Sequence, residues 1–321
     1  MPWFRRGRPP QPDRERLARQ QASIEALEAG GLPLEAETRL SRQQAGQLPW
    51  TSTLSVPGFL TARALRLRPV GHVMGSAVIR PAWSSQWLSG AWQNGEIVPL
   101  TRALNEARDL ALDRLLAEVE RLGAHGVVAV QLTETEPAWG AGLLEFQLQG
   151  TAVVFEGQAP PPRPFLGNIS AEDAYRLFAA GYIPLNVVVA STAYYIMTTP
   201  SALWAEASWA NQEVVDLSRG IYEARDAVVA RMRQQAREAG ADGVLGARWS
   251  MLVQEVEVER PAVDMWGQYG ITATFTDHIF YLSVVGTAVG RLPKAAPPPA
   301  VPCVLPLDDP VPPADLPPVE P

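Results

Sequence analysis

The sequence is poor in the residues that form redox and transition-metal sites: its 321 residues include one cysteine and three histidines. The single cysteine, Cys303, excludes an intrachain disulfide and fits a reducing compartment, so we expect a cytoplasmic protein. No apolar run approaches the roughly 20 residues that a membrane-spanning helix needs. The cluster Arg5, Arg6 and Arg8 lacks a following apolar run, so we expect neither a signal peptide nor a membrane partner.

The sequence also lacks a basic character and any recognisable catalytic motif. A net charge of −7 and a pI near 5.2 argue against a duplex nucleic-acid partner, because such proteins neutralise phosphates with a basic face. Neither a Gly-x-Ser-x-Gly elbow, nor a Ser-x-x-Lys pair, nor a phosphate-binding glycine loop is present. We therefore predict that the protein is not an enzyme and carries no cofactor.

What the sequence does contain is an internal duplication. The run Glu106-Ala-Arg-Asp109 recurs as Glu223-Ala-Arg-Asp226, at an offset of 117 residues. Further along, Gly150-Thr-Ala-Val153 recurs as Gly286-Thr-Ala-Val289, at an offset of 136. The 19 extra residues fall around Glu255 to Gly270 and predict a longer second hairpin. With 47% hydrophobic residues, each copy can bury a core of its own.

Hydrophobic periodicity gives both copies the same predicted elements. In the first copy, residues 70–79 read as a strand, residues 102–122 as a long helix, and 126–132 and 143–155 as two further strands. Thr101 and Ser218 are predicted as the helix N-caps, and Gly123 and Gly240 as left-handed C-terminal residues. The fold class is thus α+β, with two tandem β-α-β-β units.

Composition divides the chain into five segments. A polar helical extension is expected first, a proline-rich linker between the units, and a proline-rich disordered tail at the end. The predicted boundaries are 1–50 for the extension, 51–157 for the first unit, 158–169 for the linker, 170–292 for the second unit and 293–321 for the tail.

The order of these motifs resembles the YbjQ-like family, whose label is heavy-metal-binding and whose function is not established. The resemblance covers roughly residues 54–155 and 170–291. It implies a dodecin-like unit, with a long helix packed on an antiparallel sheet, and a ring-forming homo-oligomer. The ring that the resemblance implies is typically pentameric, and a ring of five units cannot be closed by a whole number of two-unit chains. Either five chains each give one unit to two stacked rings or the ring size differs, so the stoichiometry stays open. The copies could also pair within one chain.

Charged residues on the duplicated helices predict an ion-pair network at a structural or subunit interface. Arg102 and Arg219 lie in the first helical turn, where the helix dipole disfavours a cation, so each needs an acidic partner. That partner is expected one turn on, or in the preceding loop. The candidate charged residues are Glu96, Arg102, Glu106, Arg108, Asp109, Glu213, Arg219, Glu223, Arg225 and Asp226.

Two tryptophans recur in the connection before each helix: Trp87 and Trp92 in the first copy, Trp204 and Trp209 in the second. They are predicted either to pack the connection onto its own sheet or to anchor an interface, where Trp is favoured. A stacking platform for a planar ligand is an alternative that rests only on the dodecin analogy.

A metal site is not predicted, despite the family label. None of the histidines, His72, His125 and His278, is retained in both copies. The acid pairs of the duplicated Glu-Ala-Arg-Asp runs could serve a hard cation, but each has an arginine beside it.

The sequence thus predicts an oligomer-forming scaffold or binding module without enzymatic activity and with an unknown ligand. The alternative is a protein that binds a small molecule or heavy metal in a cleft between the units. The weakest hypothesis is an enzyme that uses Glu106, Arg108 and Asp109 or their counterparts in the second copy.

Overall fold

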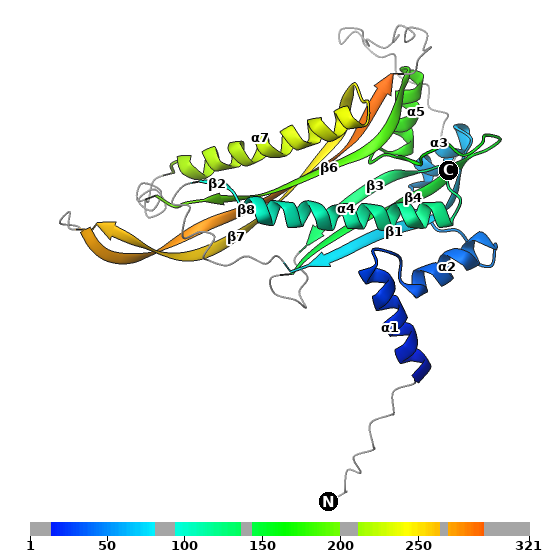
Figure 1. The fold of residues 1–321 in the computed structure, drawn as a ribbon. Helices are drawn as coiled ribbons and strands as arrows, with labels where there is room; N and C mark the ends of the chain where they lie inside the picture. The colour runs from blue at the N-terminus through cyan, green and yellow to red at the C-terminus, as the bar shows by residue number, and fades with distance from the viewer. Residues whose placement is uncertain (1–13, 81–93, 136–142, 200–210, 264–268, 292–321) are drawn as a thin grey trace, which may run out of the picture.

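The computed structural model of the protein describes residues 14–80, 94–135, 143–199, 211–263 and 269–291 (Figure 1). Within these ranges the chain is mixed α/β, with two four-stranded sheets whose strands are mainly antiparallel. This confirms the predicted α+β class. In the same ranges no helix is long and apolar enough to cross a bilayer.

Three helices precede the first sheet: α1 (Arg14–Glu28), α2 (Leu34–Gln44) and α3 (Val56–Ala64). The first two confirm the predicted polar helical lead-in. At the start of α3, Ser55 Oγ accepts a hydrogen bond from Gly58 N at 3.0 Å. This cap satisfies a backbone donor that the first helical turn leaves without a partner.

The first unit has the predicted order β-α-β-β. It consists of β1 (Leu67–Ile79), α4 (Val98–Arg121), β3 (Gly126–Thr135) and β4 (Leu144–Phe155). The short strand β5 (Phe165–Leu166) lies in the stretch predicted as a linker and pairs with β3, which gives the strand order β1-β4-β3-β5. α4 packs across β1 and β4.

The second unit repeats this order after the short helix α5 (Ala171–Ala179). It consists of β6 (Tyr182–Ile196), α7 (Val215–Glu238), β7 (Gly243–Val263) and β8 (Tyr269–Arg291). β7 and β8 form the longer hairpin that the 19 extra residues predicted. The short strand β2 (Gly95–Glu96) belongs to the first unit in sequence but pairs with β6, so the order is β2-β6-β8-β7.

The predicted N-caps are wrong, whereas the predicted C-terminal glycines are confirmed. α4 begins at Val98, three residues before Thr101, and Ile97 occupies the N-cap position. No side chain caps this helix, and the proline in its first turn has no backbone N–H that a cap would have to satisfy. α7 likewise begins before Ser218. Gly123 and Gly240 have φ of 61° and 69°, in the left-handed region that ends helices.

The elements stack with α7 on one face of the second sheet and the first unit on the other (Figure 1). Alternate residues of β6 show this: Val189 and Ala193 pack in the core that contains α4, while Ala190 and Tyr194 pack against α7. β6 is therefore buried on both faces, which accounts for its nearly continuous apolar run. α4 lies between the two sheets and joins their cores.

Candidate functional site at the contact between the units

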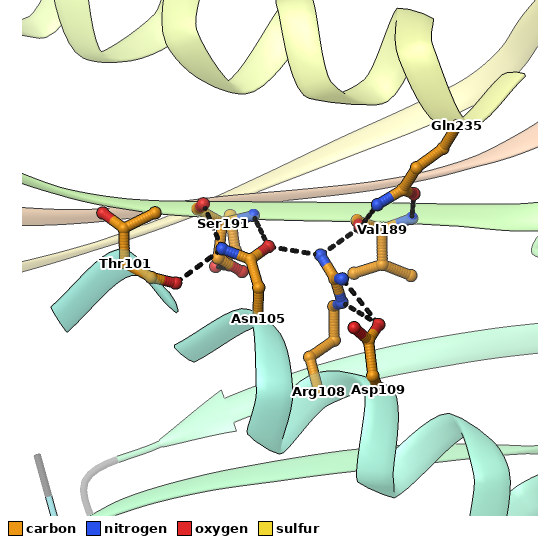
Figure 2. A network of polar contacts seen from close by, with 8 residues as sticks. Thr101, Asn105, Arg108, Asp109, Val189, Ser191 and Gln235 are labelled. Atoms are coloured by element: carbon orange, nitrogen blue, oxygen red, sulfur yellow. Dashed lines mark hydrogen bonds and ion pairs between the residues drawn. The ribbon is translucent and has the colours of Figure 1, made fainter. Parts of the chain in front are cut away.

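The two units meet where α4 of the first lies along the part of the β6 edge that β2 does not pair with. Thr101, Asn105 and Arg108 follow one another at helical spacing and so share one face of α4. An edge strand presents backbone groups that lack a strand partner. All three side chains bond to such groups on β6 (Figure 2).

Asn105 is the centre of this network. Its amide nitrogen donates to the carbonyl oxygen of Ser191 at 2.9 Å, and its amide oxygen accepts from Ser191 N at 3.2 Å. The asparagine thus replaces a neighbouring strand at that residue. One turn before it, the hydroxyl of Thr101 accepts from Ala193 N at 3.0 Å. This tertiary contact is the role that Thr101 has in place of the predicted cap.

Arg108 extends the network to Val189. Its guanidinium donates to the Val189 carbonyl oxygen and, at 2.6 Å, to the side-chain oxygen of Asn105. Gln235 of α7 donates to the same carbonyl at 2.8 Å from the other side (Figure 2). Arg108 is 4% exposed, and its charge is balanced by Asp109, at 2.6 Å. In this part of the contact, the buried Arg108 is paired with Asp109, and the backbone carbonyl at the edge of β6 has hydrogen-bond partners on both sides.

Glu96 supplies a second cross-unit link. Its carboxylate accepts from Thr192 Oγ1 at 2.9 Å and forms an ion pair with Arg231 of α7 at 2.5 Å. Burial raises the pKa of Glu96, but hydrogen bonds from Arg231, Thr101 and Thr192 outweigh burial, and the pKa lies below its ordinary value. The ion pair is therefore formed throughout the neutral range.

The corresponding edge in the first unit, that of β1, is covered by other means. Gln43 of α2 donates to the Val70 carbonyl oxygen at 2.7 Å, and Arg39 of α2 donates to that of His72 at 3.4 Å. Glu118 of α4 accepts from Met74 N at 2.9 Å and pairs with Arg39 at 2.5 Å. The N-terminal lead-in thus occupies, along β1, the place that α4 occupies along β6.

A buried carboxyl group without a cationic partner in the described chain also faces the contact. Ser191, Ser283 and Ser250 stand opposite one another on β6, β8 and β7 and form a row across the second sheet. Glu134 of β3 approaches this row, with Oε2 at 3.4 Å from Ser250 Oγ, while its buried Oε1 has no hydrogen-bond partner among the described residues. Burial raises the pKa of Glu134, and hydrogen bonds from Ser283 and Ser250 lower it only in part.

We expect Glu134→Gln to stabilise the protein at neutral pH by about 1 kcal/mol, because the variant removes an incompletely bonded buried charge. The folded pKa is raised, so the contribution of Glu134 is fully present below the unfolded value of 4.5 and is lost as pH rises through the folded pKa. Urea unfolding across the acidic to alkaline range checks this. The gap between variant and natural protein should widen as pH rises; a constant gap would contradict the assignment to Glu134.

The charged residues predicted from the sequence fall into three groups in the structure. Glu96, Arg108 and Asp109 belong to the contact between the units. Arg219 pairs with Glu223 at 3.5 Å, one turn on, as predicted, and Glu223 also accepts from the hydroxyl of Tyr194. The remaining predicted residues are exposed and form no ion pair within the described part of the chain: Arg102, Glu106, Glu213, Arg225 and Asp226.

Some predicted features lie outside the described residues. These are Trp87, Trp92, Trp204 and Trp209, together with Cys303 and the proline-rich tail from residue 293. Their predicted roles stay predictions.

An ion pair with both side chains buried, which the sequence did not reveal, fixes the long hairpin of the second unit. Asp277 of β8 is fully buried and pairs with Arg260 of β7 at 2.7 Å. The carboxylate also accepts from Thr198 N at 2.8 Å and from the hydroxyl of Tyr195. Both partners lie in the inserted or adjoining strand segments, which have no equivalent in the first copy, so the comparison of halves gave no signal for them.

Comparison with known proteins identifies the first unit. A family model described as "Putative heavy-metal-binding", the YbjQ family, matches residues 55–156, which is the first unit. A UPF0145 protein of Thermus thermophilus is 38% identical over 108 residues, which make up 33% of this chain and 89% of that protein. The chain belongs to the YbjQ-like family.

Other relatives of this YbjQ-like protein differ in length. A UPF0145 protein of Thermotoga maritima is 31% identical over 109 residues, 33% of this chain and 95% of that protein. An encapsulin nanocompartment protein of Mycobacterium tuberculosis is 28% identical over 230 residues, 70% of this chain and 86% of that protein. The similarity to the mycobacterial protein thus extends beyond a single unit.

The metal in the family description finds no matching set of side chains in the described part of this YbjQ-like protein. There, no group of three or more His, Cys, Asp or Glu side chains comes together. The ring of His125 accepts from Phe155 N at 3.2 Å, and that of His72 contacts Gln149 at 3.3 Å. Both histidines therefore have structural partners, and we derive no metal chemistry from them.

A cleft of about 270 Å³ separates β3 of the first unit from β7 of the second. Its polar lining consists of Gln131, Thr133, Arg248 and Ser250. This cleft fits the predicted alternative of a ligand between the units. Arg248 gives it a positive charge, and hydroxyl and amide groups surround that charge.

Proposed function

We propose that this YbjQ-like protein is a non-enzymatic assembly scaffold that forms homo-oligomers in the cytoplasm. The observation that carries the proposal is the contact between α4 and β6, in which one unit uses polar side chains to complete the sheet edge of the next. The functional groups singled out by the sequence, Arg108 above all, hold units together. Arg108 is buried and directed at a backbone carbonyl, which argues against the hypothesis that it acts with Glu106 in catalysis.

The similarity to an encapsulin nanocompartment protein supports a scaffold that works within a larger protein assembly. We therefore propose that the chain is a component of a protein nanocompartment. A ring-like, dodecin-related oligomer, which the family resemblance implies, stays a prediction alongside it. Because most soluble homo-oligomers are closed by point-group symmetry, we expect a closed assembly and not an open filament.

Light scattering coupled to size-exclusion chromatography tests the oligomer. We expect a mass that is a multiple of the 34.9 kDa chain at micromolar concentration. Dilution should shift the mass toward that of one chain if the association between chains is reversible. A single-chain mass at every concentration would remove the basis of the proposal.

A second candidate function rests on the cleft between β3 and β7. We propose as the alternative that this cleft holds a small anionic molecule against Arg248. Native mass spectrometry of the purified protein tests it, with Arg248→Gln as the variant. A co-purifying mass that disappears in the variant supports ligand binding, whereas identical spectra free of added mass oppose it.

A further inference from the structure

The second unit carries an exposed apolar stripe on β7. Trp249, Met251 and Val253 are 43%, 52% and 43% exposed. Their strand partners on β8, namely Val284, Leu282 and Phe280, are buried in the core under α7. α7 packs mainly on β6 and β8, so it covers the partners and leaves the stripe uncovered.

The same face of the first unit is covered within the chain. Leu132 and Glu134 hold the positions on β3 that Trp249 and Met251 hold on β7, at the offset of 117 residues. Leu132 packs against the core shared with the second sheet, and Glu134 approaches Ser250. The stripe is thus the counterpart of a surface that is covered within the chain, and this likeness marks the stripe as a place for contact with a partner.

β7 also offers backbone groups for that contact. It is the last strand in the order β2-β6-β8-β7, and along its 21 residues the described chain places no strand on its outer edge. A long, apolar edge strand is a template for pairing with another chain. Asn168, which bonds the carbonyl of Gly246, covers only the beginning of the strand.

A head-to-tail repeat of the internal contact does not suit this surface. It would place the stripe against the outer face of the first sheet, which carries Glu145, Gln147 and Gln149 on β4. The aligned positions of the second sheet, at the offset of 136 residues, are Tyr281, Ser283 and Val285. The face that receives the first unit is therefore more apolar than its counterpart, and the β1 edge beside that counterpart is already bonded by α2.

We propose that the stripe pairs with the same stripe of a second copy, through antiparallel association of the two β7 strands about a two-fold axis at Met251. This inference rests on the proposed homo-oligomer and names its surface. In that register Met251 faces Met251, and Trp249 of each copy faces Val253 of the other. Aromatic and β-branched pairs of this kind stabilise neighbouring strands.

The charges along β7 select this register. Glu255, Glu257 and Glu259 follow the stripe on the same face of the strand and are all exposed. A two-fold axis at Glu257 would set these acids against one another, and like charges directly opposite are destabilising. With the axis at Met251, each copy's acids lie beyond the other copy's stripe, and Arg248 of one copy lies opposite Gln254 of the other.

Disulfide trapping tests both the surface and the register. In a Cys303→Ser background, Met251→Cys places two thiols at directly opposed positions, whose Cα atoms are about 4.5–5.5 Å apart in antiparallel strands. That spacing suits a disulfide. We expect a cross-linked dimer under mild oxidation. Val253→Cys alone is the register control and should not cross-link, while Trp249→Cys with Val253→Cys should.

A charge variant supplies the solution measurement. Met251→Glu sets two acids opposite each other at the axis, and we expect it to weaken self-association by on the order of tenfold or more. Met251→Ser, a neutral substitution at the same exposed position, should weaken it less. Circular dichroism of both variants checks that the fold is kept.

The outcomes separate this inference from the proposed function. An oligomer that neither cross-links through the Met251→Cys thiol nor responds to Met251→Glu overturns the β7 pairing but leaves the scaffold intact. A single-chain mass for the natural protein overturns both. A single chain in which the thiol introduced by Met251→Cys is shielded from maleimide assigns the stripe to another part of the same chain, and this also overturns the pairing.

Discussion

Replacing Asp277 by alanine should lower the free energy of unfolding by about 3–5 kcal/mol, the range observed when one partner of a buried ion pair is removed. The side chain of Asp277 is fully buried, and that of Arg260 is 8% exposed. In the variant, Arg260 keeps a hydrogen bond to the Thr198 carbonyl at 3.0 Å and its guanidinium lies 4.3 Å from the Phe275 ring. Neither neighbour carries a negative charge, so a buried cation is left uncompensated.

Urea unfolding measures this loss, and two further variants interpret it. Glu257→Ala removes an exposed acid from the same hairpin and should change stability by no more than about 0.5 kcal/mol. The double variant Arg260→Met with Asp277→Leu removes both charges and should recover most of the loss, since apolar replacement of a buried pair is often neutral. A loss below about 1 kcal/mol for Asp277→Ala would show that the pair is not closed in solution.

The tyrosine beside this pair reports on it independently. Burial, reinforced by the hydrogen bond to Asp277 and its charge, raises the pKa of Tyr195 far above its ordinary value. Removal of the carboxylate takes away both effects of the neighbour and leaves burial, which the positive charge of Arg260 opposes. Spectrophotometric titration of the tyrosines in Asp277→Ala should therefore show one group that ionises at lower pH than in the natural protein.

Much of the fold could be predicted because each copy has its own hydrophobic periodicity and its own glycine and proline residues at the ends of the elements. The bulge in the second strand of each unit illustrates this agreement. Ala129 and Gly246 occupy the same position in the two copies, and both have positive φ, 54° and 63°. The two strands shift register at this point. Equal local geometry at equal sequence positions is what duplication of one unit predicts.

The predicted N-caps were wrong because helix-capping preferences consider only neighbouring residues, whereas the hydroxyl of Thr101 makes a tertiary contact. A threonine before an apolar helical pattern is a good cap in isolation. Here the hydroxyl of Thr101 lies 91 residues away in sequence from Thr192 and near the backbone of Ala193. The hydroxyl bonds to the second sheet, which packs against α4. The sequence of the first copy alone therefore could not predict this bond.

The contact between the units could be predicted from the sequence only in part. The replacement of Glu145, Gln147 and Gln149 by Tyr281, Ser283 and Val285 marks one sheet face as exposed and the other as buried. Comparison of the halves could therefore have shown which outer sheet face is covered. The partner of that face could not be found in this way, because Asn105 meets Ser191 across 86 residues through backbone groups that every residue carries.

Arg108→Ala and Arg225→Ala form a matched pair of variants with different expected outcomes. Both arginines stand at the same position of the duplicated helix, in the run Glu-Ala-Arg-Asp. Arg108 is 4% exposed and bonds Asn105 and Val189, whereas Arg225 is exposed and forms no ion pair in the described part of the chain. The difference between the variants therefore measures the contact between the units and not the composition of the helix.

We expect Arg108→Ala to cost about 1.5–3 kcal/mol, the range for hydrogen bonds to charged groups. Asp109 is 60% exposed and stays hydrated without its partner, so the cost should not reach that of a fully buried pair. Arg225→Ala should lie within about 0.5 kcal/mol of the natural protein. Arg108→Lys keeps the charge but not the planar set of donors and should fall between them.

Hydrogen exchange locates the effect. Arg108 holds the side-chain oxygen of Asn105, which in turn accepts from the backbone amide of Ser191. In Arg108→Ala that amide should exchange faster, together with its neighbours on the β6 edge, while amides of β4 in the first sheet keep their protection. Equal stability losses for the two alanine variants, or unchanged exchange at Ser191, would show that the Arg108 network does not hold the units together.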